Sequence, residues 1–237
     1  MTYVLVHGLG LSATIWNRLI PFFDDEVIAI DLPGHGNSGS TEFSWTGILR
    51  AVKDAVGAKD WSEITLVLHS FTACLLPDLI LFGISPAKII LVEGVLHPSD
   101  ASWSNKITFL NDVQFENWLI GFRQVSEIAL RSQLISRQNK EDLEIWSDSF
   151  KTVNGRALRV MAKNLRDRLH SSDLNRALKL INTKILYLRG GCSRLSQDGK
   201  FFLVNNSILI EEMPNCGHFP MIDNPESFVD MLVNSYI

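Results

Sequence analysis

The sequence has 237 residues, of which 46% are apolar and 20% are charged, and its formal net charge is −4. These values are ordinary for a soluble globular protein, and the weak negative charge argues against a nucleic-acid-binding or polybasic membrane-binding surface. The length fits one large domain, or one domain that carries an insertion.

The N-terminal sequence MTYVLVHGLG has no charged leader, so we expect no secretory signal. No apolar run approaches the roughly 18 residues that suggest a membrane span, so we expect no membrane partner. The three cysteines, Cys74, Cys192 and Cys216, are odd in number and lack metal-ligand spacing, which favours a reducing cytoplasm and packing roles. We expect neither a metal nor an organic cofactor.

Six short runs rich in Val, Ile and Leu recur along the chain, at 3–8, 27–34, 64–70, 88–94, 184–191 and 208–214. Continuous runs of this kind predict strands that are covered on both faces, as in a parallel sheet. Helical patterns alternate with them, for example at 44–58, after Ser70, and from Asn224, a predicted N-cap that Pro225 follows. This alternation predicts an α/β fold.

The segment 97–182 interrupts the alternation, because it has no convincing strand pattern and its apolar spacing indicates three or four helices. We therefore predict a core formed by residues 1–96 and 183–237, with a helical insertion at 97–182. Basic residues on the insertion could contact an anionic ligand, although their spacing favours a solvated helix face; they are Arg156, Arg159, Lys163, Arg166 and Arg168.

Side chains suited to nucleophilic catalysis follow several of the predicted strands: Ser70 follows one, Glu93 ends another, and His218 lies beyond the last. A serine hydroxyl is a poor nucleophile unless a base takes its proton and a third group orients that base. Sites in parallel α/β folds form at the carboxyl ends of the strands. We therefore expect these three side chains to meet there, beside the backbone of Leu9.

Four segments carry a resemblance to the α/β-hydrolase family that covers almost the whole chain. VHGLGLSATIW resembles the oxyanion loop, IDLPGHGNSG the D-x-x-G-x-G-x-S loop, LVLHSFTA the nucleophile elbow, and NCGHFPMIDNPESF the catalytic-histidine loop. The resemblance implies that Ser70 is the nucleophile, His218 the base, and the backbone N–H groups of Leu9 and Phe71 the oxyanion hole. The insertion then corresponds to the family's cap domain.

The chain starts directly in the strand before His7-Gly8, so we expect an α/β-hydrolase fold with about six strands, without the two strands that precede them in the family. The elbow also departs from the pattern G-x-S-x-G, because Leu68 and Thr72 replace both glycines. Since the nucleophile sits in a strained turn, we expect a looser approach or smaller neighbours around these two residues.

The position of the acid is a further departure. The family's usual acid turn reads Gly190-Gly191-Cys192-Ser193 here and holds no carboxylate; Asp198 is the nearest acid after it. Certain haloalkane dehalogenases carry a glutamate one strand earlier, and LVEGVLHP resembles that arrangement. We therefore predict that Glu93 orients His218, with Asp198 as the alternative.

The predicted substrate pocket lies between the sheet edge and the cap, and five aromatic residues are candidates to line it: Phe71, Trp103, Phe109, Trp118 and Phe122. An apolar pocket favours a small or medium hydrophobic carboxylic ester, cleaved through an acyl-enzyme. The same triad also serves thioesterases, C–C bond hydrolases and ligand receptors with slow hydrolysis, and an inactive scaffold is a further alternative. The expected partner is a small-molecule substrate.

Overall fold

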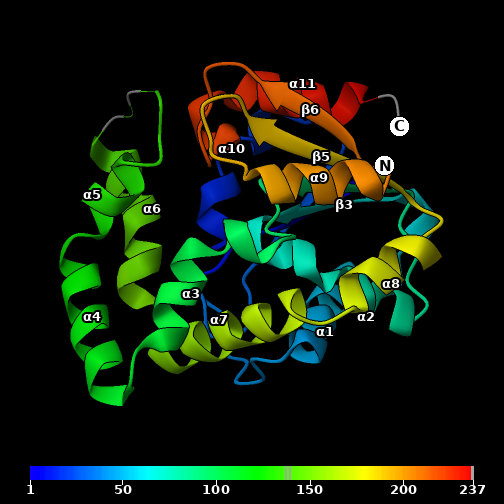
Figure 1. The fold of residues 1–237 in the computed structure, drawn as a ribbon. Helices are drawn as coiled ribbons and strands as arrows, with labels where there is room; N and C mark the ends of the chain where they lie inside the picture. Colours follow the sequence, from blue (N-terminus) through cyan, green and yellow to red (C-terminus); the bar gives the residue numbers. More distant parts are fainter. Residues whose placement is uncertain (137, 139, 236–237) are drawn as a thin grey trace.

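The computed structural model describes residues 1–136, 138 and 140–235, and its centre is a six-stranded sheet (Figure 1). The strand order is β2-β1-β3-β4-β5-β6, and every neighbouring pair is parallel. The strands are β1 (Thr2–Val6), β2 (Glu26–Ile30), β3 (Ile64–His69), β4 (Lys88–Val92), β5 (Lys184–Gly190) and β6 (Leu209–Met213). This confirms the predicted α/β class and the six parallel strands.

The continuous apolar runs of the central strands are explained by burial on both faces of the sheet. Every residue of β1 and β3 is buried. Val4 and Val6 belong to one apolar cluster, whereas Tyr3 and Leu5 belong to the other. Successive side chains of a strand point to opposite faces, so the central strands of this sheet carry apolar residues at consecutive positions.

Helices of the core cover both faces of the sheet. The first cluster includes apolar residues of α1 (Trp45–Val56), α2 (Leu76–Leu81) and α9 (Gln197–Asn205), and the second those of η1 (Ala13–Trp16) and α11 (Pro225–Asn234). Asn224 accepts a hydrogen bond from the backbone N–H of Ser227 and caps α11, as predicted. Short elements complete the core: η2 (Ile20–Phe22), η3 (Trp61–Glu63), η4 (Ser70–Leu75), η5 (Pro98–Asp100) and α10 (Pro220–Asp223).

Between β4 and β5 the described residues form six longer helices and no strand. They are α3 (Ser102–Phe109), α4 (Asp112–Gln124), α5 (Ser126–Arg131), α6 (Lys140–Thr152), α7 (Gly155–Leu169) and α8 (Asp173–Leu180). The number exceeds the three or four expected. The reason is that N-capping residues divide the apolar pattern into shorter helices. Asn111 forms a capping box with Gln114, and Asn154 caps α7. In Figure 1, α4, α5 and α6 stand to one side of the molecule, whereas α8 packs against α2.

Candidate active site

Ser70, Glu93 and His218 meet at the carboxyl edge of the sheet. The Nε2 atom of His218 lies 3.3 Å from the Oγ atom of Ser70, and its Nδ1 atom lies 3.3 Å from the Oε2 atom of Glu93. An ionised carboxylate accepts but does not donate, so Nδ1 carries the ring proton of the neutral histidine. Nε2 is then free of a proton and faces the serine hydroxyl, which is the arrangement that a general base needs.

The backbones of Ser70 and Glu93 share an uncommon conformation. Their φ angles are +57° and +51°, in the left-handed region that residues other than glycine rarely adopt. Backbone hydrogen bonds hold both: Val95 N–H donates to the carbonyl of Ser70 at 3.0 Å, and Glu93 N–H donates to the carbonyl of Leu188 at 2.9 Å. Non-glycine residues held in this region cluster at functional sites, which sets these two apart from ordinary strand ends.

The elbow turn forms without its two glycines because neighbouring positions are small. A side chain at Gly8 would come within 2.8 Å of the His69 ring and 3.1 Å of Ser70 Cβ. A side chain at Gly94 would come within 2.7 Å of the Ala73 methyl group. The hydroxyl of Thr72, which replaces the second glycine, donates to the carbonyl of His69 at 2.9 Å. The expectation of a looser approach or smaller neighbours concerned Leu68 and Thr72; the glycines described here lie against His69, Ser70 and Ala73 of the same turn.

The carboxylate of Glu93 is buried and fully engaged. Its Oε1 atom accepts hydrogen bonds from the backbone N–H of Gly190 and from the hydroxyl of Ser193, each at 2.6 Å. Ser193 lies in the turn after β5, where the family usually carries its acid. Here that turn donates hydrogen bonds to Glu93, which follows the neighbouring strand β4. Asp198 lies on α9 and accepts from the Ser99 hydroxyl at 3.0 Å. Among the described residues, His218 therefore contacts Glu93 rather than Asp198.

Two neutral histidines fasten the loop of Leu9 to the loop that follows β2. His7 donates through Nδ1 to the carbonyl of Gly8 at 2.7 Å and accepts at Nε2 from the N–H of Leu32 at 3.0 Å. His35 donates through Nδ1 to the carbonyl of Pro33 at 3.0 Å and accepts at Nε2 from the N–H of Gly10 at 3.0 Å.

Burial disfavours a charge on either of these rings, and it lowers the pKa of His7 well below the usual histidine value and that of His35 to about 4. Both rings therefore stay neutral and keep one donor and one acceptor each. The bonds to Leu32 and Gly10 fix the backbone on either side of Leu9. The backbone N–H of Phe71 lies in the first turn of η4, where N–H groups lack intrahelical partners. An oxyanion hole formed by Leu9 and Phe71 stays a prediction.

His69 links the elbow to the histidine loop. Its Nε2–H donates to the carbonyl of His218 at 3.1 Å, and its ring is fully buried. Burial is the main cause that lowers the pKa of His69 to about 3. The sequence identified His69 only as the residue before the nucleophile, and its role in holding the His218 backbone depends on a contact across the sheet edge.

Three of the five candidate pocket residues, Trp103, Trp118 and Phe122, form an aromatic cluster that also contains Phe150. Ring centroids lie 5.1 Å apart for Trp118 and Phe122, and 5.3 Å apart for Phe122 and Phe150. A side chain at Gly10 would come within 3.0 Å of the Phe150 ring and 3.3 Å of the Trp103 ring. The cluster therefore lies against the loop of Leu9.

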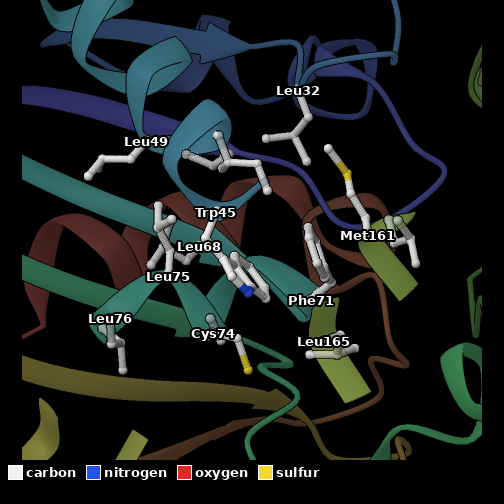
Figure 2. Close-up of a cluster of buried hydrophobic side chains, with 14 of the residues drawn as sticks. Leu32, Trp45, Leu49, Leu68, Phe71, Cys74, Leu75, Leu76, Met161 and Leu165 are labelled. Carbon is white, nitrogen blue, oxygen red and sulfur yellow. The ribbon is translucent and has the colours of Figure 1, made fainter. Parts of the chain in front are cut away.

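The other two candidates lie elsewhere. Phe71 is buried in the core, where it stacks on Trp45 and faces α7 (Figure 2). Phe109 is 73% exposed, and the Arg166 guanidinium covers its ring at 5.0 Å. Phe71 was a candidate because it follows Ser70, and Phe109 because it lies in the predicted insertion; neither position indicates the partner of the ring. Phe150 is not among the predicted pocket residues.

The described part of the chain contains no group of three or more His, Cys, Asp or Glu side chains that could hold a metal ion. In the same residues, no helix has both the length and the apolar character that crossing a bilayer requires.

Comparisons with known proteins agree with the fold. A family model described as "Alpha/beta hydrolase family" matches residues 3–231. The chain is similar to a haloalkane dehalogenase loop variant from Bradyrhizobium elkanii (TM-score 0.78, 17% identity, 99% of this chain and 88% of that one). An esterase from Exiguobacterium antarcticum gives a TM-score of 0.74 at 17% identity, over 99% of this chain and 91% of that one.

A curated protein, a pimeloyl-[acyl-carrier protein] methyl ester esterase from Methylococcus capsulatus, is 41% identical over 56 residues. This match spans 22% of this chain and 22% of that protein.

Proposed function

The chain belongs to the alpha/beta hydrolase family, and from this premise we propose that it is a serine hydrolase that cleaves small or medium hydrophobic carboxylic esters through an acyl-enzyme. The observation that carries the proposal is the paired contact of His218, at 3.3 Å to Ser70 on one ring nitrogen and at 3.3 Å to Glu93 on the other. A relay of hydroxyl, imidazole and carboxylate is the arrangement that activates a serine.

The proposed reaction has two halves. In the first, Ser70 Oγ attacks the ester carbonyl while His218 Nε2 takes its proton, and the N–H groups of Leu9 and Phe71 stabilise the oxyanion. His218 then gives the proton to the departing alkoxide, which leaves as the alcohol. In the second half, His218 takes a proton from water, which attacks the acyl-enzyme, and His218 then returns that proton to Ser70 Oγ as the carboxylic acid departs. Glu93 holds the imidazole in one tautomer throughout.

The preference for a hydrophobic ester rests on the aromatic cluster of Trp103, Trp118, Phe122 and Phe150. Phe150 and Trp103 lie against Gly10, next to the proposed oxyanion donor Leu9, and Phe122 and Trp118 pack on them. A substrate group that extends from Ser70 toward Gly10 would contact these rings. Such contacts favour apolar acyl or aromatic groups over charged ones. The name of the curated relative, a methyl ester esterase, supports an ester as the substrate class.

The test is turnover on matched substrates. We expect repeated turnover of p-nitrophenyl esters with acetyl to octanoyl chains, and a higher kcat/KM for them than for the corresponding thioesters or for a β-diketone. Ser70→Ala should lower kcat by at least about four orders of magnitude, because it removes the attacking atom. A higher kcat/KM on the thioesters or the β-diketone would contradict the ester assignment, and a single slow turnover would indicate a receptor.

A further inference from the structure

A carboxylate outside the proposed triad connects the histidine loop to the cap. The Oδ1 atom of Asp223, at the end of α10, accepts three hydrogen bonds, from the N–H of Ile135 and from the N–H and the hydroxyl of Ser136, each at 2.8 Å. Its Oδ2 atom accepts from the N–H of Gly217 at 2.7 Å. Ile135 and Ser136 lie in the connection between α5 and α6, and Gly217 immediately precedes His218.

The packing around Gly217 brings the same two segments together. A side chain at this position would collide with the carbonyl oxygen of Gln133 and would come within 3.4 Å of Ile135. The side chain of Gln138 donates from the cap to the carbonyl of Ile222 at 3.2 Å. Gln133, Ile135 and Gln138 of the connection between α5 and α6 therefore contact the segment around the proposed base.

Asp223 has no role in capping the next helix, since the side chain of Asn224 caps α11. Its carboxylate is committed to the cap connection and to Gly217. Among the described residues, the ring of His218 forms two side-chain hydrogen bonds, both of 3.3 Å, and it is 30% exposed. It also packs against the rings of His69 and Phe219, with centroids 5.1 and 5.2 Å away. Because both hydrogen bonds are long, the placement of this ring also depends on how its own backbone is held.

We propose that Asp223 is a positioning residue that couples the seating of the cap to the placement of His218. When the α5–α6 connection is seated, three donors fix the carboxylate, and its second oxygen holds Gly217 so that His218 reaches both Ser70 and Glu93. A displaced connection frees the carboxylate, so Gly217 loses this acceptor and the backbone of His218 is held less firmly, by the bond from His69. This inference rests on the proposed function, because it assigns a consequence to the placement of the base.

The α5–α6 connection leads into α6, which carries Phe150 of the aromatic cluster. A substrate that contacts this cluster therefore touches the helix that follows the segment bound by Asp223. With this coupling, kcat depends on whether the substrate contacts the aromatic cluster of the cap.

The experiment compares Asp223→Asn with Ser136→Ala. In Asp223→Asn the amide oxygen stays with the three donors of the cap, and the amide nitrogen then faces the N–H of Gly217, donor against donor. Ser136→Ala removes one cap-side bond and keeps the bond to Gly217. We expect Asp223→Asn to lower kcat about 10- to 100-fold with KM within about threefold, because small displacements of a catalytic group carry such costs. Ser136→Ala should keep kcat within about threefold of the wild type.

A second readout separates this inference from the proposed function. ¹⁵N-histidine spectra at pH 8, assigned with His218→Gln, report which ring nitrogen of His218 carries the proton. The coupling predicts one tautomer, protonated at Nδ1, in the wild type and Ser136→Ala, and a mixture in Asp223→Asn. An unchanged tautomer together with an unchanged kcat in Asp223→Asn would overturn the coupling. A wild type with that single tautomer and no turnover of any ester would overturn the proposed function alone.

Discussion

The proposed nucleophile, Ser70, and the proposed base, His218, are held in place by different kinds of interaction. Ser70 begins η4, whose next five residues are all at most 1% exposed. Figure 2 shows Phe71 of this turn among Trp45 of α1 and Met161 and Leu165 of α7. His218, by contrast, lies in a loop between β6 and α10 that carboxylates, N–H groups and hydroxyls hold.

An ion pair strengthens the apolar side. Arg168 of α7 donates to the carboxylate of Asp78 at 2.9 Å, and its guanidinium lies 4.9 Å from the ring centre of Trp45. Both charged side chains are nearly buried, at 11% and 7% exposure. The arginine that the sequence offered as a possible contact for an anion thus serves to attach α7 beneath the nucleophile.

The difference separates two requirements of a catalytic site. Dense apolar packing fixes a position and adds stability, but it cannot choose which ring nitrogen of a histidine carries a proton. Hydrogen bonds to carboxylates are directional and can choose it. Substitutions on the base side should therefore cost mainly activity, and substitutions on the nucleophile side should cost mainly stability.

The largest effect is expected from Glu93→Gln on the base side. The amide oxygen should stay with its donors Gly190 and Ser193, which places the amide nitrogen against Nδ1 of His218. Nδ1 must then accept, so the ring proton moves to the nitrogen that faces Ser70, and the base is lost. We expect kcat to fall by about two to four orders of magnitude, a loss measured with p-nitrophenyl esters while circular dichroism reports the fold.

Asp198→Asn is the matched control, and it should leave kcat within about threefold of the wild type. If Asp198→Asn loses most of its kcat and Glu93→Gln keeps a kcat near that of the wild type, Asp198 is the acid that orients His218 and Glu93 is structural.

On the nucleophile side, Phe71→Ala should mainly reduce stability. The substitution removes a buried ring from the contacts with Trp45 and α7, and cavities of this kind cost about 3–5 kcal/mol. The backbone N–H of residue 71 remains, so kcat of the folded variant should fall less than in Glu93→Gln. Urea unfolding measures the cost, with Phe71→Leu as the milder control. A loss of kcat larger than in Glu93→Gln, at unchanged stability, would show that the side chain serves the reaction itself.

A loss of stability is also expected from acid, because His7, His35 and His69 are buried in the neutral form. The pKa of His35 is lowered to about 4 and that of His69 to about 3, whereas an unfolded histidine titrates near 6.5. Between these values the unfolded state binds a proton that the folded state rejects. Stability should therefore fall with decreasing pH, from about pH 6.5, by about 1.4 kcal/mol per pH unit for each histidine.

Urea unfolding at pH 7, 6 and 5 measures this slope. His35→Gln, which can still donate and accept, should reduce it by about one histidine's share. A free energy of unfolding that does not change between pH 6.5 and pH 5 would show that these rings titrate normally in the folded protein.

The motifs in the sequence predicted the fold because each strand is a local apolar run and each motif ends one. They also predicted that Ser70, Glu93 and His218 would meet, since parallel strands end at one edge. Ser193 and Asp223 could not be recognised as partners, because their contacts join segments about a hundred residues apart. Phe109 shows a similar limit, because helical spacing indicates a helix face, whereas the neighbour across that face is set by tertiary packing.

The most direct test of the central claim is the site that a serine-directed fluorophosphonate labels. An activated serine, with His218 as its base, should react rapidly and stoichiometrically, and peptide mapping by mass spectrometry should place the label on Ser70 alone. Ser70→Ala should take up no label, and His218→Gln should react at least about a hundredfold more slowly than the wild type. Labelling of another residue, or equal labelling of the wild type and Ser70→Ala, would contradict the assignment of Ser70 as the nucleophile.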